Sequence, residues 1–416
     1  MIKIYKDDTL STEEIMSRDG EGFDASAIVR EIIANVRKNG DAALREYCEK
    51  FDGGAPESLL VSAEEIDAAF EKIPAELVAA MTEARDNIRA FHEKQVRNGF
   101  VMGEKEGVVL GQKVTPIEKV GLYVPGGTAS YPSTVLMDAI PAKIAGCSEI
   151  VITTPAKNGV VSPAILVAAR LAGVDKIYKI GGAGAVAALA YGTETVGKVD
   201  KIVGPGNVFV AEAKRQVFGV VGIDMVAGPS EILIIADGKS NPKYVAADML
   251  SQAEHDKLAS AVLVTDSAEL ERQIPLLPRA EIARASIDGA SKIIVRENLS
   301  SVIDTANEIA PEHLEVCVDA PFDLLPKIKN AGSIFLGRNC PEALGDYFAG
   351  PNHTLPTSGT ARFSSPLSVD DFTKKSSFIY YTKEALSEVA GKIDIFAKFE
   401  GLEAHARSAT IRFDEE

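Results

Sequence analysis

The sequence predicts an α/β protein with two Rossmann-like doubly wound domains, one inserted in the other, plus an N-terminal arm and a C-terminal helical tail. From residue 117 onward, short apolar runs alternate with glycine-rich loops and helical segments, a pattern typical of parallel sheets covered on both faces. The same alternation continues with wider spacing after residue 231, which indicates a second α/β unit. A chain of 416 residues is also too long for a single core.

The N-terminal part shows no strand–loop–helix alternation. Residues 1–20 are polar without a strong period and are predicted to form an arm. A helical period covers about residues 24–52 and restarts after Gly40, and a second helical run covers about residues 62–96. His92 in the second run has no partner in its local sequence, so we interpret it as structural.

The first group of β–α units predicts an inserted domain over residues 123–232. Its strand-like runs are residues 120–124, 149–154, 176–180 and 201–203, and each precedes a helical segment. These strands are short and almost wholly apolar, as expected where helices cover both faces of a sheet.

The second group predicts a discontinuous α/β domain over residues 21–122 and 233–365. Its strand-like runs are residues 231–236, 261–265, 292–295, 314–318 and 333–336. The remaining residues, 366–416, are predicted to form the tail, with helical segments near residues 387–397 and 404–412.

Composition and charge exclude several classes of function. The net charge of −16 and the absence of a basic run argue against a nucleic-acid partner. No stretch approaches the roughly 20 apolar residues of a membrane span, and the N-terminus lacks the apolar core of a signal peptide. The four cysteines are widely spaced, so we expect a cytoplasmic protein without disulfides. Cys147 and Cys317 lie in apolar segments and are interpreted as core residues, not nucleophiles.

Three glycine-rich loops follow predicted strands, at residues 125–127, 181–184 and 204–207. Loops at the carboxyl ends of parallel strands are where such sheets bind ligands. The middle loop formally matches G-x-G-x-x-A, but a dinucleotide fingerprint also needs an acidic residue at the end of the next strand. The nearest candidate, Asp200, precedes its strand instead. A nucleotide across these loops therefore remains an open prediction.

Polar residues with ligand or acid–base chemistry gather in a few loop-flanked positions. Gln252 and His255 lie three apart at the end of a helical run, so they share one face. Glu312 and His313 are adjacent and could supply a water-activating carboxylate and a general base. Read alone, each pair could also be an ordinary solvated segment.

Further candidates lie towards the C-terminus. Asp346 and His353 occupy polar segments without a clear structural role, and Glu400 and His405 lie in the tail. Mixed nitrogen and oxygen ligands with open positions suit a divalent metal such as zinc. The spacing alone does not decide which of these residues come together.

These motifs, taken in order, resemble the histidinol dehydrogenases over essentially the whole chain from about residue 25. The matching segments are residues 120–127, 133–137, 199–202, 204–207, 227–231, 250–255, 311–315, 331–337, 345–347, 352–357 and 401–405. So many motifs in one order are highly specific. The resemblance implies an NAD-linked, zinc-dependent oxidation of L-histidinol to L-histidine through the aldehyde, with two NAD molecules used in turn.

The resemblance also implies a role for individual residues. One zinc ion per subunit would be held by Gln252, His255, Asp346 and His405. In the family the last ligand comes from the partner subunit, so a homodimer with shared active sites is expected. His313 would be the general base and Glu312 would activate water.

The resemblance also implies which residues contact the substrate and the cofactor. Ser230, His353 and Glu400 would bind the substrate together with His313 and the zinc ligands. Tyr123 and Asn207 would contact NAD. Gly184 departs from the family, which usually has glutamine there, so a cofactor contact at Gly184 is doubtful.

Three other interpretations compete with this one. A paralogue on the same scaffold could oxidise another alcohol or diol with NAD. A zinc hydrolase would also use a metal with Glu312 and His313, but it would leave the glycine loops unexplained. A non-catalytic small-molecule binding protein would leave the Glu312–His313 pair unexplained.

Overall fold

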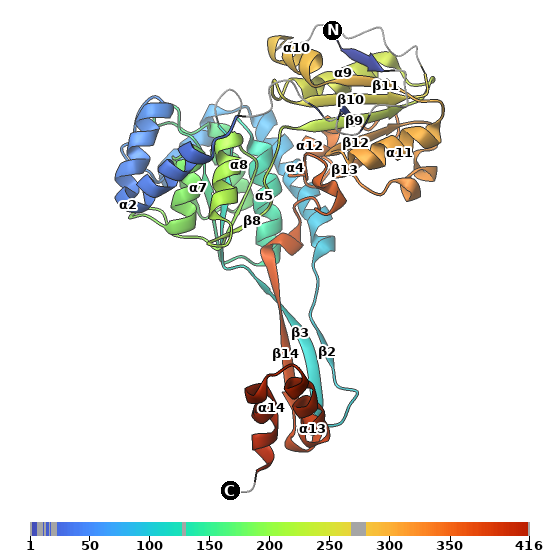
Figure 1. Cartoon of the computed structure of the whole chain (residues 1–416). Helices are drawn as coiled ribbons and strands as arrows, with labels where there is room; N and C mark the ends of the chain where they lie inside the picture. The colour runs from blue at the N-terminus through green and yellow to red at the C-terminus, as the bar shows by residue number, and fades with distance from the viewer. Residues whose placement is uncertain are drawn as a thin grey trace. The chain divides into compact units, whose positions relative to one another are not determined.

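The computed structural model describes residues 2–5, 11, 14, 15, 17, 23–126, 130–267 and 280–414. It divides into two compact units, one of Met1–Gln95 with Ile117–Phe372 and one of Val96–Pro116 with Thr373–Glu416 (Figure 1). Both large sheets of the first unit are parallel, so the predicted α/β class is confirmed. Gly127 and most of the predicted arm lie outside the described residues.

The first sheet has five parallel strands in the order β6-β5-β4-β7-β8. Its strands are β4 (Lys119–Tyr123), β5 (Glu149–Thr153), β6 (Lys176–Tyr178), β7 (Lys201–Val203) and β8 (Gly222–Ile223). The strand order runs outward from β4 to β6 and then reverses, with β7 on the other side of β4. The carboxyl ends of β4 and β7 flank this reversal, which is the position where open parallel sheets bind ligands.

Helices cover both faces of this sheet. They are α5 (Pro132–Ala145), α6 (Pro163–Ala172), α7 (Gly182–Tyr191) and α8 (Val208–Val217). Along β5, Ile150 and Ile152 pack into one apolar cluster and Val151 packs into another. Because successive side chains of a strand point to opposite faces, both faces of the sheet are buried. The apolar runs in the sequence reflect this double burial.

The second sheet has six parallel strands in the order β1-β11-β10-β9-β12-β13. Its strands are β1 (Lys3–Tyr5), β9 (Glu231–Ala236), β10 (Ser260–Thr265), β11 (Lys292–Val295), β12 (His313–Cys317) and β13 (Ser333–Leu336). The intervening helices are α9 (Pro242–Ala253), α10 (Ala280–Gly289), α11 (Leu299–Ile309) and α12 (Glu342–Tyr347). In register, His313 pairs with Ile232 and Ser333, so it lies at the amino edge of the sheet.

Part of the predicted arm is a strand. Lys3, Ile4 and Tyr5 pair in parallel with Lys292, Ile293 and Ile294 of β11. This strand is not predictable from the sequence pattern, because three residues are too few to show a period.

The N-terminal helices are α2 (Ser26–Phe51), α3 (Ala63–Ala69) and α4 (Ala75–His92). Helix α2 is interrupted at Gly40, whose φ of 51° is outside the helical region, and its period in the sequence also breaks there. Helix α2 packs against α7 and α8, and α4 packs against α5. The apolar stripe of α2 is therefore buried against helices of the five-stranded sheet.

The second unit contains a three-stranded antiparallel sheet in the order β14-β3-β2. Its elements are β2 (Phe100–Met102), β3 (Val108–Pro116), β14 (Thr373–Tyr381), α13 (Lys383–Phe399) and α14 (Glu403–Thr410). The two helices lie where the sequence predicted helical segments in the tail. Strand β14 was not predicted.

Short 3-10 helices complete the described chain: η1 (Phe70–Lys72), η2 (Glu93–Gln95), η4 (Pro321–Asp323), η5 (Leu325–Lys327), η6 (Thr360–Arg362), η7 (Val369–Phe372) and η8 (Ile411–Phe413).

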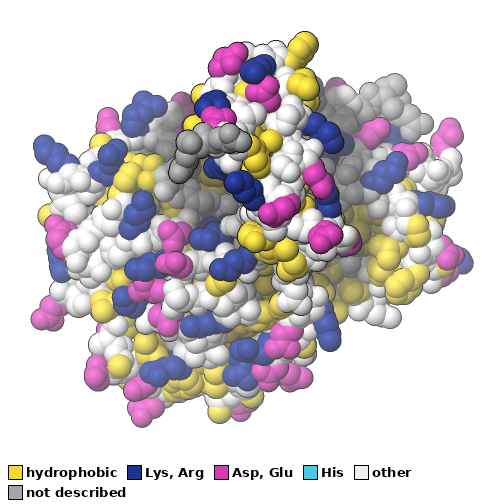
Figure 2. Space-filling view, turned by 90° about the horizontal axis from the view of Figure 1, so that it is seen from below, with side chains coloured by type: hydrophobic (Ala, Val, Ile, Leu, Met, Phe, Trp, Pro, Cys, Tyr) yellow, Lys and Arg dark blue, Asp and Glu magenta, His cyan; other side chains and the backbone are white. Residues whose placement is uncertain are grey.

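The surface agrees with the acidic, mixed-charge composition. On the face shown in Figure 2, Lys and Arg side chains are interspersed with Asp and Glu side chains and do not form one basic patch. Over the residues that the structure describes, no helix combines the length and the apolar character needed to cross a membrane.

Candidate active site

Glu312 and His313 are held by the main chain of Glu231 on the neighbouring strand. The Glu231 N–H donates to Glu312 Oε2 at 2.8 Å, and His313 Nδ1 lies 3.0 Å from the Glu231 carbonyl oxygen. A carbonyl can only accept, so Nδ1 carries a proton, and Nε2 has a lone pair when the ring is neutral. Nε2 is buried and has no hydrogen-bond partner among the described residues. It is therefore available to take a proton from a bound molecule.

Burial and neighbouring charges tune this pair. Burial raises the pKa of Glu312 to about 8. Burial alone lowers the pKa of His313, but the negative charges of Glu342 and Glu312 outweigh it and raise that pKa well above its ordinary value. The site therefore stabilises a positively charged imidazolium at His313.

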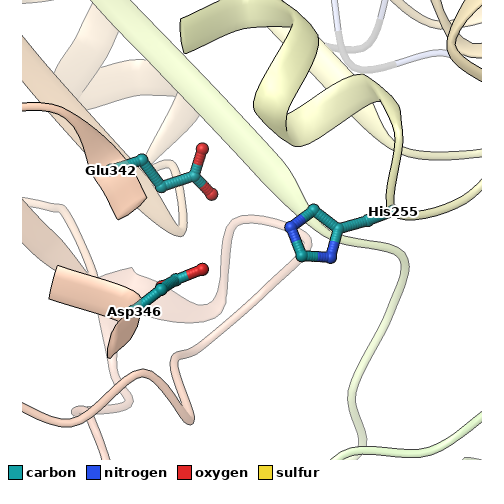
Figure 3. A group of neighbouring side chains, drawn as sticks. All are labelled: His255, Glu342 and Asp346. Carbon is teal, nitrogen blue, oxygen red and sulfur yellow. The ribbon is translucent and has the colours of Figure 1, made fainter. Parts of the chain in front are cut away.

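Three ligand-type side chains converge beside His313. The ligand atoms of His255, Glu342 and Asp346 all lie within 4.8 Å of one another. Glu342 and Asp346 lie four apart on α12 and therefore project from one face of the helix, and their carboxylates point towards the His255 ring (Figure 3). One imidazole nitrogen and two carboxylates are a donor set that suits a divalent cation such as zinc.

Gln252 is fully buried next to this cluster. In the amide orientation that satisfies both of its ends, its nitrogen donates to the Glu342 carboxylate and its oxygen accepts from the Glu231 N–H at 3.2 Å. His255 follows the end of α9, where its N–H donates to the Gln252 carbonyl at 3.2 Å. The predicted Gln252–His255 pair is thus brought to the cluster, although the Gln252 amide bonds to a carboxylate there.

Glu342 was missed by the sequence analysis. Its signal was the i, i+4 spacing with Asp346, which is visible only if a helix is assigned to residues 342–347. The run is short and contains Gly345, so the sequence did not show a helix there.

Asp346 and His353 are also brought to His313. Asp346 Oδ1 lies 3.5 Å from His313 Nε2. The His353 Nδ1–H donates to the Asp346 carbonyl at 3.0 Å, and its Nε2 lies 3.3 Å from Thr134 Oγ1. All three residues line a cavity of about 100 Å³. Burial lowers the pKa of His353, which favours a neutral ring.

The remaining predicted substrate residues lie in different places. Ser230 directly precedes Glu231, whose main chain holds Glu312 and His313, and the Ser230 carbonyl accepts from the Ser260 N–H at 3.0 Å. Glu400, at the end of α13, and His405, on α14, are exposed in the second unit. Their part in the site remains a prediction.

The predicted cofactor residues lie at the end of β4, at the start of α8 and in α7, next to the glycine loops of the five-stranded sheet. The Tyr123 hydroxyl accepts from the Gly182 N–H at 3.1 Å. Burial raises the pKa of Tyr123 to about 12, so its hydroxyl stays protonated. Asn207 caps α8, and its side-chain oxygen accepts from the Phe209 and Val210 N–H groups. Gly184 is buried in α7.

The two cysteines considered as nucleophiles are core residues, as predicted. Burial raises the pKa of the Cys147 thiol to about 11 and that of Cys317 to about 12. Both side chains belong to apolar clusters. Neither thiol forms the reactive thiolate at neutral pH.

Known proteins of one family resemble this chain over nearly its whole length. The family model described as histidinol dehydrogenase matches residues 17–413. The histidinol dehydrogenase of Clostridium acetobutylicum is 54% identical, covering 99% of both chains, and that of Syntrophotalea carbinolica is 56% identical, covering 92% of this chain and 91% of the relative. The crystal structure of histidinol dehydrogenase from Elizabethkingia anophelis superposes with a TM-score of 0.93 at 39% identity, covering 99% of this chain and 98% of that one. A family match over nearly the whole length confirms the resemblance stated from the motifs, and the chain belongs to the histidinol dehydrogenase family.

Proposed function

We propose that this protein oxidises L-histidinol to L-histidine through L-histidinal, with two NAD molecules as successive oxidants. The observation that carries the proposal is the His313 ring. Its Nδ1–H bonds to the Glu231 carbonyl, while Nε2 has no hydrogen-bond partner among the described residues and lies beside a cluster of metal-ligand type. This is the arrangement that proton removal from an alcohol requires.

In the first oxidation, His313 Nε2 takes the hydroxyl proton of the substrate. NAD, when bound, accepts the hydride that leaves the alcohol carbon in each of the two oxidations. The nearby carboxylates of Glu342, Glu312 and Asp346 stabilise the imidazolium that His313 becomes. The products of this step are the aldehyde, one NADH and one proton.

In the second oxidation, Glu312 removes a proton from water as the water adds to the aldehyde carbon. One oxygen of Glu312 is held by the Glu231 N–H, so the carboxylate has a fixed orientation. Burial makes Glu312 a stronger base than an exposed glutamate once it is ionised. Loss of a hydride and a proton from the hydrated aldehyde then yields the carboxylic acid and a second NADH.

Gln252, His255, Asp346 and His405 of the partner subunit would hold one zinc ion. When bound, zinc would orient the amine and imidazole of the substrate and offset the carboxylate charges around His313. The convergence of His255 and Asp346 supports this assignment, and Glu342 is an additional candidate ligand. Ser230, His353 and Glu400 would complete the substrate contacts.

We infer that each parallel sheet belongs to a Rossmann-like doubly wound domain, with residues 123–232 as the inserted NAD-contacting part. The reversal of strand order at β4, and at β9 in the second sheet, supports this inference. Tyr123 and Asn207 lie next to the first reversal, where a cofactor would bind.

Residues 366–416 would form the dimerisation tail of a cytoplasmic homodimer with shared active sites. Large apolar side chains are exposed on this part of the second unit: Ile379 is 75%, Phe396 is 70% and Phe399 is 94% exposed. Such side chains are expected to be covered by a partner, and a second copy of the chain is the proposed partner.

The activity is tested by measuring NADH formation from L-histidinol, with and without a chelator. We expect about two NADH per histidinol and loss of activity after zinc removal. No NADH from histidinol, but NADH from another alcohol or diol, would favour the paralogous dehydrogenase. Hydrolytic turnover without NAD would favour a zinc hydrolase.

The shared site is tested by mixing two inactive variants, His313→Ala and His405→Ala. Hybrid dimers would contain one complete site, so part of the activity should return. Verified hybrids without activity would show that His405 acts within its own subunit or not at all.

A further inference from the structure

Helix α5 presents three polar groups to the segment that carries His353. Thr134, Met137 and Asp138 lie at i, i+3 and i+4, so they share one face of the helix. Thr134 Oγ1 lies 3.3 Å from His353 Nε2, and the Met137 carbonyl accepts from Asn352 Nδ2 at 2.6 Å. Asp138 Oδ1 accepts from the hydroxyl of the next residue, Thr354, at 2.9 Å. The side chains of residues 352–354 are thus held by two side chains and one main-chain carbonyl of α5.

Asp138 also faces the cofactor-side loop. It is fully buried, and its Oδ2 has no hydrogen-bond partner among the described residues. A Cβ atom placed on Gly204 would lie 3.2 Å from Oδ2. The carboxyl group therefore fills the space between the 352–354 segment and Gly204, which begins the loop with Asn207.

The same loop is anchored by two more buried charged groups. The Lys214 ammonium donates to the Gly204 carbonyl at 2.9 Å and pairs with Asp224. The Gly204 N–H donates to Asp224 Oδ2 at 2.8 Å. Both polar groups of the Gly204 main chain are thus bonded to buried charged side chains. The position of Gly204 is therefore fixed on both sides of its main chain.

From this geometry we propose that Asp138 is a positioning residue that fixes residues 352–354 against the Gly204 loop, and through His353 fixes the substrate side of the active site. The inference rests on the proposed histidinol oxidation. His353 connects this segment to the metal-ligand cluster, because its Nδ1–H bonds to the carbonyl of Asp346, a member of that cluster. One buried carboxyl group thereby links the cofactor side to the substrate side.

The hydrogen bond from Thr354, and not a negative charge, is the important feature. Burial raises the pKa of Asp138 to about 8, and the charge of Asp224 adds to this effect. At neutral pH the group is therefore mainly a neutral acid that accepts one hydrogen bond. An asparagine side chain has nearly the same shape and can accept the same bond through its amide oxygen.

The test compares Asp138→Ala, Asp138→Asn and Thr354→Val in the zinc-loaded full-length protein. We measure kcat, KM for histidinol, KM for NAD, the melting temperature, and zinc retention against a competing chelator. Thr153→Val is the matched control for Thr354→Val, because the Thr153 hydroxyl is also buried but has no hydrogen-bond partner among the described residues.

We expect Asp138→Ala and Thr354→Val to lower kcat/KM for histidinol roughly 10- to 100-fold, as displaced catalytic groups do, and to release zinc at a lower chelator concentration. Asp138→Asn should stay within about threefold of wild type, since the accepted hydrogen bond persists. Thr153→Val should leave both KM values and zinc retention unchanged. If Asp138→Ala does not fold, Thr354→Val carries the test.

Two results would overturn the proposal. One is wild-type kcat, KM values and zinc retention in Thr354→Val. The other is an Asp138→Asn variant as impaired as Asp138→Ala, since that would assign the effect to charge. A wild-type protein that makes no NADH from histidinol would instead refute the proposed function, while zinc retention in the variants would still test the positioning role.

Discussion

Replacing Lys214 with methionine should strongly destabilise the first unit. The Lys214 and Asp224 side chains are only 1% and 2% exposed, so Lys214→Met leaves the Asp224 carboxylate buried without its countercharge. Asp224 would keep the N–H donors of Gly204 and Met225, but the Gly204 carbonyl would lose Lys214 as its donor. Removing one partner of a buried ion pair typically costs about 3–5 kcal/mol.

The assay is equilibrium unfolding in urea, followed by far-UV circular dichroism. The matched control is Lys176→Met. Lys176 also pairs with a carboxylate, that of Glu149 on the five-stranded sheet, but these two side chains are 47% and 24% exposed. That change should cost less than about 1 kcal/mol.

A second control removes both charges. Lys214→Met combined with Asp224→Asn should recover a large part of the loss, because no uncompensated charge remains buried. The reasoning is refuted if Lys214→Met costs less than about 1 kcal/mol, or if the double variant is no more stable than Lys214→Met alone. The cofactor-side loop supplies an independent readout, since KM for NAD should rise in the single variant when Gly204 loses its anchor.

Three further predictions follow from the site and its surroundings. His313→Ala should abolish NADH formation while zinc content, measured by atomic absorption, stays at the wild-type level; retained turnover would remove His313 from the mechanism. Gly184→Gln should lower KM for NAD by about 2- to 10-fold if the added amide makes one hydrogen bond to the cofactor. Gly184→Ala is the control and should not lower this KM. Both variants should crowd Tyr47, which lies 3.3 Å from a Cβ atom placed on Gly184. Asp138→Asn should flatten the pH dependence of stability, because the Asp138 pKa of about 8 in the folded protein is far above the ordinary aspartate value of 3.8. Between pH 3.8 and pH 8 the folded state binds one more proton at Asp138 than the unfolded state, so the stability of the wild type falls as pH rises. Relative to the variant, the loss between pH 5 and pH 8 should be up to about 4 kcal/mol. Urea midpoints that change equally in both proteins between these two pH values would contradict this prediction.

Local patterns identified much of the fold. The apolar runs that became β4, β5, β9, β10 and β12 are buried on both faces, and such runs are visible in the sequence whatever they pair with. The interruption of α2 at Gly40 was also visible, because it depends only on this residue and its neighbours in the sequence. Packing between elements was not visible. The apolar stripe of α2 shows that one face is buried, but not which sheet buries it.

Part of the candidate site was likewise visible in the sequence, and part was not. Glu312 and His313 could be recognised because they are adjacent, and their chemistry depends on residue type. The sequence also identified glycine loops at the carboxyl ends of strands. It placed His313 at the start of a strand, but it did not show that Ile232 of β9 and Ser333 of β13 would be its neighbours, because that depends on register.

By itself, the sequence determined the α/β class, the strand–loop–helix units, the family and the chemical type of the candidate residues. Only the tertiary structure showed that the Glu231 main chain fixes the side chains of Glu312 and His313. It also showed that Glu342 joins His255 and Asp346, and that Gln252 is buried. The physical reason is that periodicity and residue type report how each segment is buried, whereas hydrogen bonds between distant segments depend on strand register and on packing across the whole unit.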